Sequence, residues 1–217
     1  MGDISKKVSV EVVKRLPRYY RYLRDLADNG VVRISSQSLG EKMNITASQI
    51  RQDLNCFGGF GQQGYGYNVE ALYNAIGEIL GLHDGHKTII VGSGHLGHAL
   101  INYKSFEKRG FSIIGVFDVK EELIGENLGG HKVMHMDNLE AFIEAEKPDI
   151  AVLAIPKTAA NNVAQRLVTC GIKGFMNFCY VDIDVPSDVC VENIHLSDTL
   201  MTLSYRLKNS QNKDFSL

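Results

Sequence analysis

The chain has 217 residues, of which 44% are hydrophobic and 22% are charged, and this length suits one large domain or two small ones better than three. Its longest apolar run covers residues 150–156, far short of the roughly 20 residues that cross a bilayer, so we expect no membrane span. The N-terminus has no signal-peptide core and the four cysteines form no Cys-x-x-Cys pair, which predicts reduced thiols and a cytoplasmic protein.

Charge is distributed unevenly along the chain. The net charge of −2 on its own argues against nucleic-acid binding. Residues 1–66 nevertheless hold ten Lys or Arg against six Asp or Glu, a balance of +4, whereas residues 67–217 hold thirteen against nineteen, a balance of −6. This asymmetry indicates a polyanionic partner at the N-terminal end.

The first predicted helix begins within residues 8–13, and Pro17 either kinks it or restarts it as a first-turn proline. A core-facing stripe at helical spacing follows, formed by Tyr19, Tyr22, Leu23, Leu26 and Ala27, and Asn29-Gly30 ends the helix. Five cations surround the stripe with no acid among them: Lys14, Arg15, Arg18, Arg21 and Arg24. From this segment alone, DNA contact and a solvated helix face are equally good interpretations.

A helix-turn-helix motif is predicted next. Residues 31–34 form a short expected strand, residues 36–43 a short helix, and Asn44-Ile45 leaves little room to turn. The following helix opens at Thr46, whose hydroxyl and the Gln49 amide are expected to form a reciprocal capping box. Its buried face is expected to contain Ile50, Leu54 and Phe57. The exposed side chains of this helix are of the types that read base edges.

A glycine-rich and aromatic stretch, FGGFGQQGYGYNV, follows the second short helix directly. It fits a hairpin wing whose backbone lies close against phosphate or a minor groove. The alternative is a flexible interdomain loop, which has little need of the four aromatic residues. The predicted DNA-binding residues are therefore Lys14, Arg15, Arg18, Ser48, Gln49, Arg51, Gln52, Asn55, Gly61, Gln62, Gln63 and Tyr65.

A dinucleotide-binding motif follows an amphipathic helix over residues 69–80 and a linker over 82–86. Residues 88–91 form a predicted buried strand, and Gly92-Ser93-Gly94-His95-Leu96-Gly97 then matches G-x-G-x-x-G before a helical pattern. Gly92 permits the tight turn, Gly94 lets the backbone approach a pyrophosphate, and Gly97 lets the helix pack closely on its strand. The hexapeptide alone is weak evidence in a chain with 21 glycines.

A second predicted strand, residues 113–117, ends in Asp118 at a distance suited to a carboxylate that accepts both ribose hydroxyls of an adenosine. Such a carboxylate repels a 2'-phosphate, which predicts NAD(H) rather than NADP(H). Further strands over 132–134, 149–155 and 172–178 alternate with helices over 139–145 and 159–168, which predicts a parallel doubly wound sheet. Ligands bind beyond the carboxyl ends of such strands, where Ile155-Pro156 and Asn177-Phe178 lie.

The C-terminal segment has one apolar face, formed by Leu196, Leu200, Leu203 and Leu207, with no further domain after it. The segment either folds back on its own sheet or packs across a dimer, and the residues leave both open. The expected organisation is an N-terminal domain over 1–81, a Rossmann domain over 82–194 and a C-terminal helix and tail over 195–217.

No enzymatic or metal site is predicted. His131 and His135 are spaced i, i+4, but on an expected strand or turn, where this spacing does not converge on a metal ion. A small NAD-dependent oxidoreductase is the main alternative function, and it needs an acid or base over the nicotinamide and a substrate domain, for which too few residues remain after 178. A module that binds CoA or another adenosine ligand would leave the basic N-terminal domain unexplained.

The string SQIRQDLNCFGGFGQQGYGYNV, followed about twenty residues later by IIVGSGHLGHAL, resembles the Rex family of bacterial redox-sensing transcriptional repressors. The resemblance extends over about residues 8–208. It implies a winged-helix DNA-binding domain, a Rossmann domain that senses NADH against NAD+, a palindromic operator and a homodimer with an exchanged C-terminal helix. It also places Tyr103, Phe178 and, from the partner subunit, His195 and Leu196 at the nicotinamide.

Six residues at four places in the chain depart from the family pattern. Gln52 stands where a lysine is common, and Gln62-Gln63 replaces basic residues of the wing, so fewer phosphates are expected to be neutralised. Cys179-Tyr180 replaces Ala-Pro, and His195 replaces an aspartate that the family often has near the nicotinamide. These departures concern the details of the DNA contact and of the redox switch.

Overall fold

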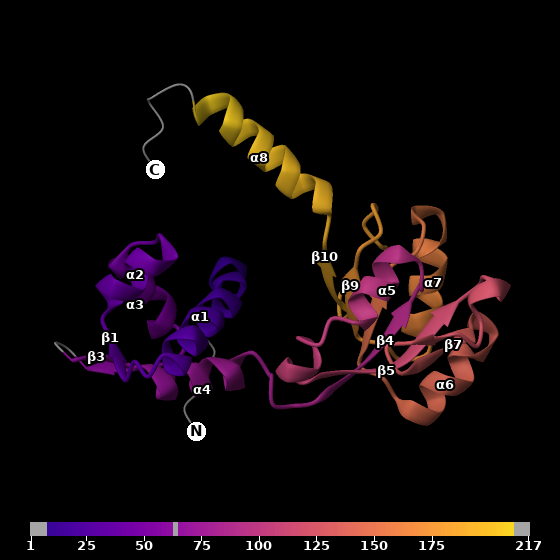
Figure 1. Ribbon diagram of the computed structural model, residues 1–217, viewed down its shortest axis with the longest axis horizontal. Coiled ribbons are helices and arrows are strands. Elements are labelled where there is room, and N and C mark those ends of the chain that lie inside the picture. The colour runs from indigo at the N-terminus through magenta and orange to yellow at the C-terminus, as the bar shows by residue number, and fades with distance from the viewer. Residues whose placement is uncertain (1–7, 63–64, 211–217) are drawn as a thin grey trace. The chain divides into compact units, whose positions relative to one another are not determined.

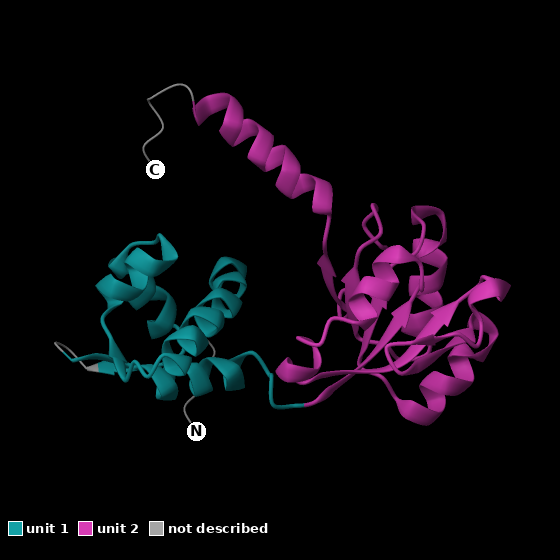
Figure 2. Ribbon diagram, viewed as in Figure 1, with its two compact units in different colours: residues 1–84 teal, residues 85–217 magenta. Residues whose placement is uncertain are grey.

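The computed structural model describes residues 8–62 and 65–210, except for the side chain of Gln62. The chain divides into two compact units, residues 1–84 and residues 85–217 (Figure 2). The boundary between the units falls inside the predicted linker, three residues after the expected end of the N-terminal domain.

Unit 1 begins with α1 (Val10–Asp28), a single helix capped by Ser9, whose hydroxyl accepts from the Val12 N–H. Pro17 lies inside this helix and does not restart it, because the buried stripe continues on both sides of it: Val12, Leu16, Tyr19, Leu23 and Leu26. The predicted core residue Ala27 is exposed, because it lies at the edge of this stripe.

Five short elements follow α1: β1 (Arg33–Ile34), α2 (Ser36–Met43), α3 (Ala47–Asn55), β2 (Gly61–Gln62) and β3 (Gly66–Asn68). The three strands form an antiparallel sheet of order β1-β3-β2, and α4 (Val69–Ile79) continues from it to pack on α1. Between α2 and α3, Asn44 adopts a left-handed conformation (φ +53°), which allows the tight turn. Unit 1 is a winged helix-turn-helix with one apolar core.

The strands of unit 2 are β4 (His86–Val91), β5 (Phe111–Asp118), β6 (Asn127–Leu128), β7 (His131–His135), β8 (Ile150–Leu153), β9 (Gly174–Asn177) and β10 (Cys190–Asn193). Its α-helices are α5 (His95–Ile101), α6 (Leu139–Glu146), α7 (Lys157–Thr169) and α8 (Leu196–Ser210) (Figure 1). Three short 3-10 turns complete it: Glu107–Arg109, Glu121–Leu123 and Met136–Asn138.

The sheet of unit 2 has the order β10-β9-β8-β4-β5-β7-β6, which is the Rossmann order with one extra strand. The predicted parallel doubly wound sheet is confirmed, and the extra strand β6, which was not predicted, pairs antiparallel with β7 at one edge. The opposite edge strand, β10, is parallel to β9 and was not predicted, because it is mostly exposed and carries no apolar run.

Residues 88–91 of the central strand β4 are buried on both faces, which explains the apolar run Ile89-Ile90-Val91 at its carboxyl end. Ile89 and Val91 pack in the core that α6 and α7 cover, whereas Ile90 packs with Ile101 of α5 on the other face. Helix α8 differs from these helices, because it buries none of its residues. Its exposed apolar side chains are Leu196, Leu200, Met201, Leu203, Tyr205 and Leu207.

Candidate functional site

The glycine loop of unit 2 follows the carboxyl end of β4. Gly92 has φ +100°, and a Cβ there would lie 2.4 Å from the Ala154 carbonyl oxygen. A Cβ at Gly97, the third residue of α5, would lie 1.8 Å from the Gly92 carbonyl oxygen, so the helix can lie this close to the loop only with glycine at this position. A Cβ at Gly94 would meet nothing within 4 Å, and His95 beside it is exposed. The three glycines therefore make a tight turn with an open face, as the motif predicts.

Asp118, at the end of β5, anchors this loop. It is buried, and its Oδ2 accepts from the Ser93 N–H at 2.7 Å and from the Ser93 hydroxyl at 2.8 Å. Its Oδ1 accepts from the N–H groups of Val119 at 2.8 Å and Lys120 at 3.0 Å. Burial raises the pKa of Asp118, but these hydrogen bonds lower it by more, so the net pKa lies below its usual value.

The sequence predicted that Asp118 accepts ribose hydroxyls. In the structure each of its oxygens already accepts two hydrogen bonds from the protein, so its four acceptor sites are occupied. The carboxylate still places a fixed negative charge beside the loop.

The predicted residues after β8 and β9 differ in their surroundings. Ile155 lies against the glycine loop, since a Cβ at Gly92 would be 2.9 Å from its Cγ2, and Pro156 next to it is exposed at the start of α7. Phe178 packs partly buried on the α5 face of the sheet. Asn177 is fully buried, and its Nδ2 donates to the Val181 carbonyl and to Asn193 Oδ1. The Asn177 amide therefore shapes this edge of the sheet.

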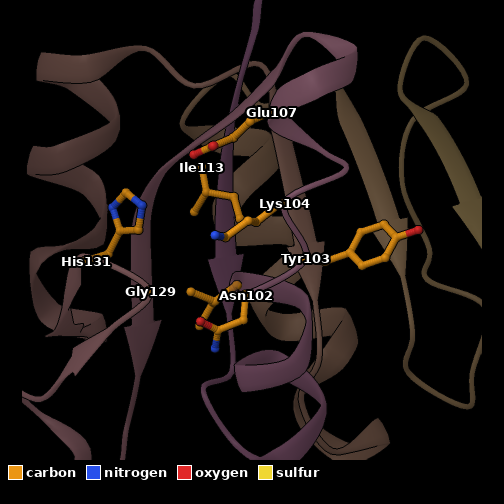
Figure 3. A pocket seen from close by; sticks show the side chains of 8 residues that line it. Asn102, Tyr103, Lys104, Glu107, Ile113, Gly129 and His131 are labelled. Carbon is orange, nitrogen blue, oxygen red and sulfur yellow. The ribbon is translucent and has the colours of Figure 1, made fainter.

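Tyr103 lies beyond the C-terminal end of α5, about 10 Å along the helix from the glycine loop. It is 53% exposed and packs edge-on against Phe106 at 5.1 Å. It borders a pocket of about 270 Å³ that lies toward the amino ends of β5 and β7, and its ring points away from the other labelled side chains (Figure 3). The single chain therefore does not bring Tyr103 together with Asp118 or the loop.

In unit 1, α3 presents the predicted reading face. Thr46 caps it, because its hydroxyl accepts from the Gln49 N–H at 3.1 Å. The expected reciprocal bond from the Gln49 side chain is wrong, since its Nε2 donates to Asp53 at 2.7 Å instead. Phe57 is only partly buried. The four exposed polar residues of the helix are Ser48, Arg51, Gln52 and Asn55.

Asp53 is the residue that sequence reasoning missed. It is fully buried and accepts from Arg15 Nε at 2.7 Å, Arg15 Nη2 at 2.8 Å and the Tyr19 hydroxyl at 2.9 Å. Burial raises the pKa of Asp53, but the hydrogen bonds from Arg15, Gln49 and Tyr19 bring the net pKa below its usual value. The available signal was its position three residues after Ile50, on the buried stripe of α3.

The three predicted cations of α1 have different surroundings. Arg15 is held in the bidentate ion pair with Asp53, which ties α1 to α3. Arg18 donates to the Met43 carbonyl at the end of α2 and lies over the Tyr22 ring, 5.8 Å from its centroid. Lys14 is exposed. Of these three, Lys14 is the side chain that the fold leaves directed to solvent.

The wing is the β2–β3 hairpin. Gly61 is required there because a Cβ would lie 2.8 Å from the Tyr67 ring, and Gly66 because its φ is +70° and a Cβ would lie 2.5 Å from the Ile34 carbonyl oxygen. Tyr65 is 70% exposed. The backbone of Gln62 pairs with Gly66, whereas Gln63 lies outside the described residues.

The described ranges contain neither a cluster of metal-ligand residues nor a membrane-spanning helix. Among residues 8–62 and 65–210, no three His, Cys, Asp or Glu residues are grouped as metal ligands would be. Within the same ranges, no helix is long and apolar enough to cross a membrane.

Comparison with known proteins covers both units. Residues 7–55 match the family model described as "Putative DNA-binding protein N-terminus", and residues 83–181 match "CoA binding domain". A redox-sensing transcriptional repressor Rex from Thermoanaerobacter pseudethanolicus (strain ATCC 33223 / 39E) is 56% identical over 205 residues, covering 94% of this chain and 92% of the relative.

Two solved structures are similar over 95% of this chain. A crystal structure of RSP in complex with β-NAD+ and operator DNA has a TM-score of 0.90 and 55% identity and is covered over 95% of its length. A crystal structure of RSP in complex with β-NADH has a TM-score of 0.88 and 52% identity and is covered over 97% of its length.

Proposed function

Because the chain belongs to the Rex family of redox-sensing transcriptional repressors, we propose that it binds operator DNA through unit 1 and releases it when NADH binds to unit 2. The observation that carries this proposal is the combination, in one chain, of a winged helix-turn-helix and a Rossmann glycine loop that match Rex relatives over nearly their full length. The relatives are named as repressors, which favours a regulator over the alternative of a small oxidoreductase.

The cofactor site is proposed at the open face of the glycine loop. The first turn of α5 offers N–H groups that have no partner within the helix, and the space above Gly94 allows a pyrophosphate to approach them. The proposed NAD(H) contacts are Gly92, Ser93, Gly94, His95, Leu96, Gly97, Ile155, Pro156 and Phe178. Asp118 is proposed to hold the glycine loop in place and to supply a negative charge beside it, and Asn177 to support the carboxyl end of β9. Tyr103 is proposed to approach the nicotinamide from outside the loop.

The DNA site is proposed on α3 and the wing. Ser48, Gln52 and Asn55 are exposed and are proposed to face base edges, as is Arg51, one of whose N–H groups donates to Ser36 in the single chain. Gly61, Gln62 and Tyr65 of the wing are proposed to contact the backbone, together with Gln63, which lies outside the described residues. Lys14 is proposed as a phosphate contact. Arg15 and Gln49 hold α3 through Asp53, and Arg18 holds the end of α2, so we propose that these three act mainly by positioning the motif.

A homodimer is proposed through α8. Six large apolar side chains of this helix are exposed, and burying one such side chain stabilises by about 1.5–3 kcal/mol. Folding back on its own sheet would bury some of them, yet none is buried in unit 2. A second copy of the chain, with exchanged helices, covers this face and pairs two reading heads with a palindromic operator. Leu196, which is 64% exposed, is then available to the partner's cofactor site. His195 is proposed to reach the same site, and in the single chain its side chain is 21% exposed, lies beside the Tyr180 ring and has its Nδ1 3.6 Å from Asp198 Oδ2.

The switch is proposed to work by geometry. NAD+ carries a charged planar nicotinamide and NADH a neutral puckered one, so discrimination arises around that ring, and NADH favours a dimer whose heads no longer match successive half-sites. By linkage, DNA lowers NADH affinity by the same factor by which NADH lowers DNA affinity. Shifting the protein from mostly DNA-bound to mostly DNA-free needs a coupling free energy of roughly 5 kcal/mol. A repressor of chromosomal DNA in a bacterium acts in the cytoplasm, where we place it.

A mobility-shift titration tests this function. The full chain is titrated onto genomic DNA fragments at fixed salt, and the bound fragment is then challenged with NADH, NAD+ or CoA at equal micromolar concentrations. We expect release by NADH and little release by NAD+ or CoA. Equal effects of NADH and NAD+ would reject the redox-sensor function even if both nucleotides bind. Release by CoA alone would instead favour a sensor of another adenosine ligand.

A further inference from the structure

An arginine of β1 contacts a tyrosine of the wing, and no sequence motif indicated this pair. Arg33 stands on β1, and its Nη1 donates to the Tyr65 carbonyl oxygen at 3.3 Å. The Arg33 guanidinium also lies over the Tyr65 ring, 5.9 Å from its centroid. Residues 32 positions apart in the chain thus meet beside the β2–β3 turn.

This pair supplies the positive charge of the wing. No Lys or Arg occurs between Arg51 and Lys87, so neither β2 nor β3 has a cation of its own. Arg33 is exposed, and in the described part of the chain no carboxylate lies within ion-pair distance of it. Its charge is therefore available to a ligand.

The two contacts also prepare the guanidinium for binding. One N–H donates to the Tyr65 carbonyl and the guanidinium carbon lies 5.9 Å from the ring centroid, while the other four of the five N–H donors remain for a ligand of this exposed side chain. Fixing a long side chain before binding reduces the conformational entropy lost on binding.

The reading helix lies on the same small framework. Arg51 of α3 donates to Ser36 at 2.9 Å. Burial raises the pKa of Tyr67, and Arg51 lies near enough for its positive charge to offset part of that rise. Tyr67 in turn pairs with Ile34 of β1, next to Arg33. A winged helix that places α3 in the major groove brings its wing toward the adjacent backbone and minor groove. A narrow A/T-rich minor groove has an enhanced negative potential that attracts arginine.

We propose that the Arg33–Tyr65 pair reads the minor groove of an A/T-rich flank of the operator, in place of the basic wing residues that this chain lacks. This inference rests on the proposed DNA-binding function. Arg33 inserts its guanidinium, and Tyr65, 70% exposed, packs against the sugar-lined wall of the groove. The sequence selected by the protein then depends on base pairs that α3 does not touch.

The test uses the full chain and a duplex that the wild-type protein selects from random-sequence DNA. The flank predicted to face the wing is made with A·T, G·C or inosine·C pairs. Inosine·C has the major groove of G·C but lacks the guanine amino group in the minor groove, so it separates readout in the two grooves. Wild-type protein is expected to bind the A·T and inosine·C flanks at least about fivefold more tightly than the G·C flank.

Three variants and a control decide the role of the pair. Arg33→Ala and Tyr65→Ala should reduce this preference to less than about twofold, and Arg33→Lys should retain general affinity while losing most of the preference. Arg24→Ala is the matched control, because Arg24 is an exposed arginine of unit 1 that faces Asp28 at 3.6 Å, and it should leave the preference unchanged.

The outcomes separate this inference from the proposed function. If Arg33→Ala weakens all three duplexes by one factor, the pair contacts phosphate or merely supports the wing, and the inference is overturned. It is also overturned if the wild-type protein selects DNA but shows no flank preference, or if G·C differs from A·T while inosine·C behaves like G·C. Selection of no duplex at all rejects the proposed function itself.

Discussion

Removal of the buried Asp53 carboxylate should destabilise unit 1 and loosen α3. Asp53 is fully buried and accepts four hydrogen bonds, two of them from Arg15. Asp53→Ala leaves the Tyr19 hydroxyl, also fully buried, without its acceptor, and frees the Arg15 guanidinium at the interface of α1 and α3. The variant therefore loses the polar link between the first helix and the reading helix.

The size of the effect follows from burial. Removing one partner of a buried ion pair costs about 3–5 kcal/mol, and leaving a buried hydroxyl unsatisfied costs about 1–3 kcal/mol. The Arg15 side chain is 30% exposed and regains part of its hydration, so the low end applies. We expect a loss of about 3 kcal/mol in the free energy of unfolding of unit 1, which corresponds to roughly 100-fold faster exchange of globally protected amides.

Hydrogen exchange with mass spectrometry measures this loss separately in the two units. Peptides from α1 and α3 should lose protection in Asp53→Ala, while peptides from β4 and β8 should not change. Asp28→Ala is the control, since it removes an exposed ion pair with Arg24 that contributes about 0–1 kcal/mol. Equal protection of α1 and α3 in the wild-type protein and in Asp53→Ala would refute the argument from burial.

Lowering the pH tests separately whether the ionised Asp53 carboxylate stabilises unit 1. The folded-state pKa of Asp53 lies below its usual value, so its contribution is fully present above the unfolded pKa, about 3.9, and is lost as the pH falls through the folded pKa. The difference in urea midpoint between wild-type protein and Asp53→Ala should accordingly be largest near pH 7 and shrink below about pH 4. A difference that grows on acidification would contradict this assignment.

Three further predictions concern the two sites. Gly97→Ala should abolish NADH binding and destabilise unit 2, because its Cβ would lie 1.8 Å from a carbonyl oxygen. Gly94→Ala should retain stability but weaken NADH binding by about tenfold or more, because its Cβ would crowd the pyrophosphate. Nucleotide titration and thermal unfolding distinguish the two variants. Asp118→Asn should narrow the preference for NADH over NADPH, measured by nucleotide fluorescence, and an unchanged preference would reject the charge argument. Lys14→Ala should lower the salt-dependence slope of DNA binding by about 0.9 with unchanged stability, whereas Arg15→Ala should mainly lower stability, because it leaves Asp53 unpaired.

Strong local periodicity made most of the elements predictable. Helix 36–43 and the start of α8 at Leu196 match the structure, and the predicted strands and helices of unit 2 lie within a few residues of the observed ones. These segments carry their signal in consecutive residues. The edge strands β6 and β10 do not, because they are short and largely exposed, and their pairing depends on neighbours far away in sequence.

Side-chain partners were less predictable than elements. Arg15 and Asp53 are 38 residues apart, and nothing local distinguishes Arg15 from the other cations of α1. A charged residue on an apolar helical stripe signals a buried partner, but it does not say which of several arginines supplies it. The prediction of DNA-contacting cations therefore could not separate residues that hold the fold from those that face solvent.

At the cofactor site, too, the sequence predicted the position of a residue but not its hydrogen-bond partners. The observed partners of Asp118 change how we expect the protein to prefer NADH over NADPH. Spacing predicted the position of Asp118, yet its hydrogen bonds come from Ser93 in the loop and from the two residues that follow it. A carboxylate with four protein donors is held rigidly and ties the glycine loop to the end of β5. Its net lowered pKa keeps it ionised at neutral pH, so a 2'-phosphate meets a fixed charge that cannot turn away. We therefore expect selectivity for NADH over NADPH to follow from charge at a fixed place, without a new hydrogen bond from Asp118 to the ribose.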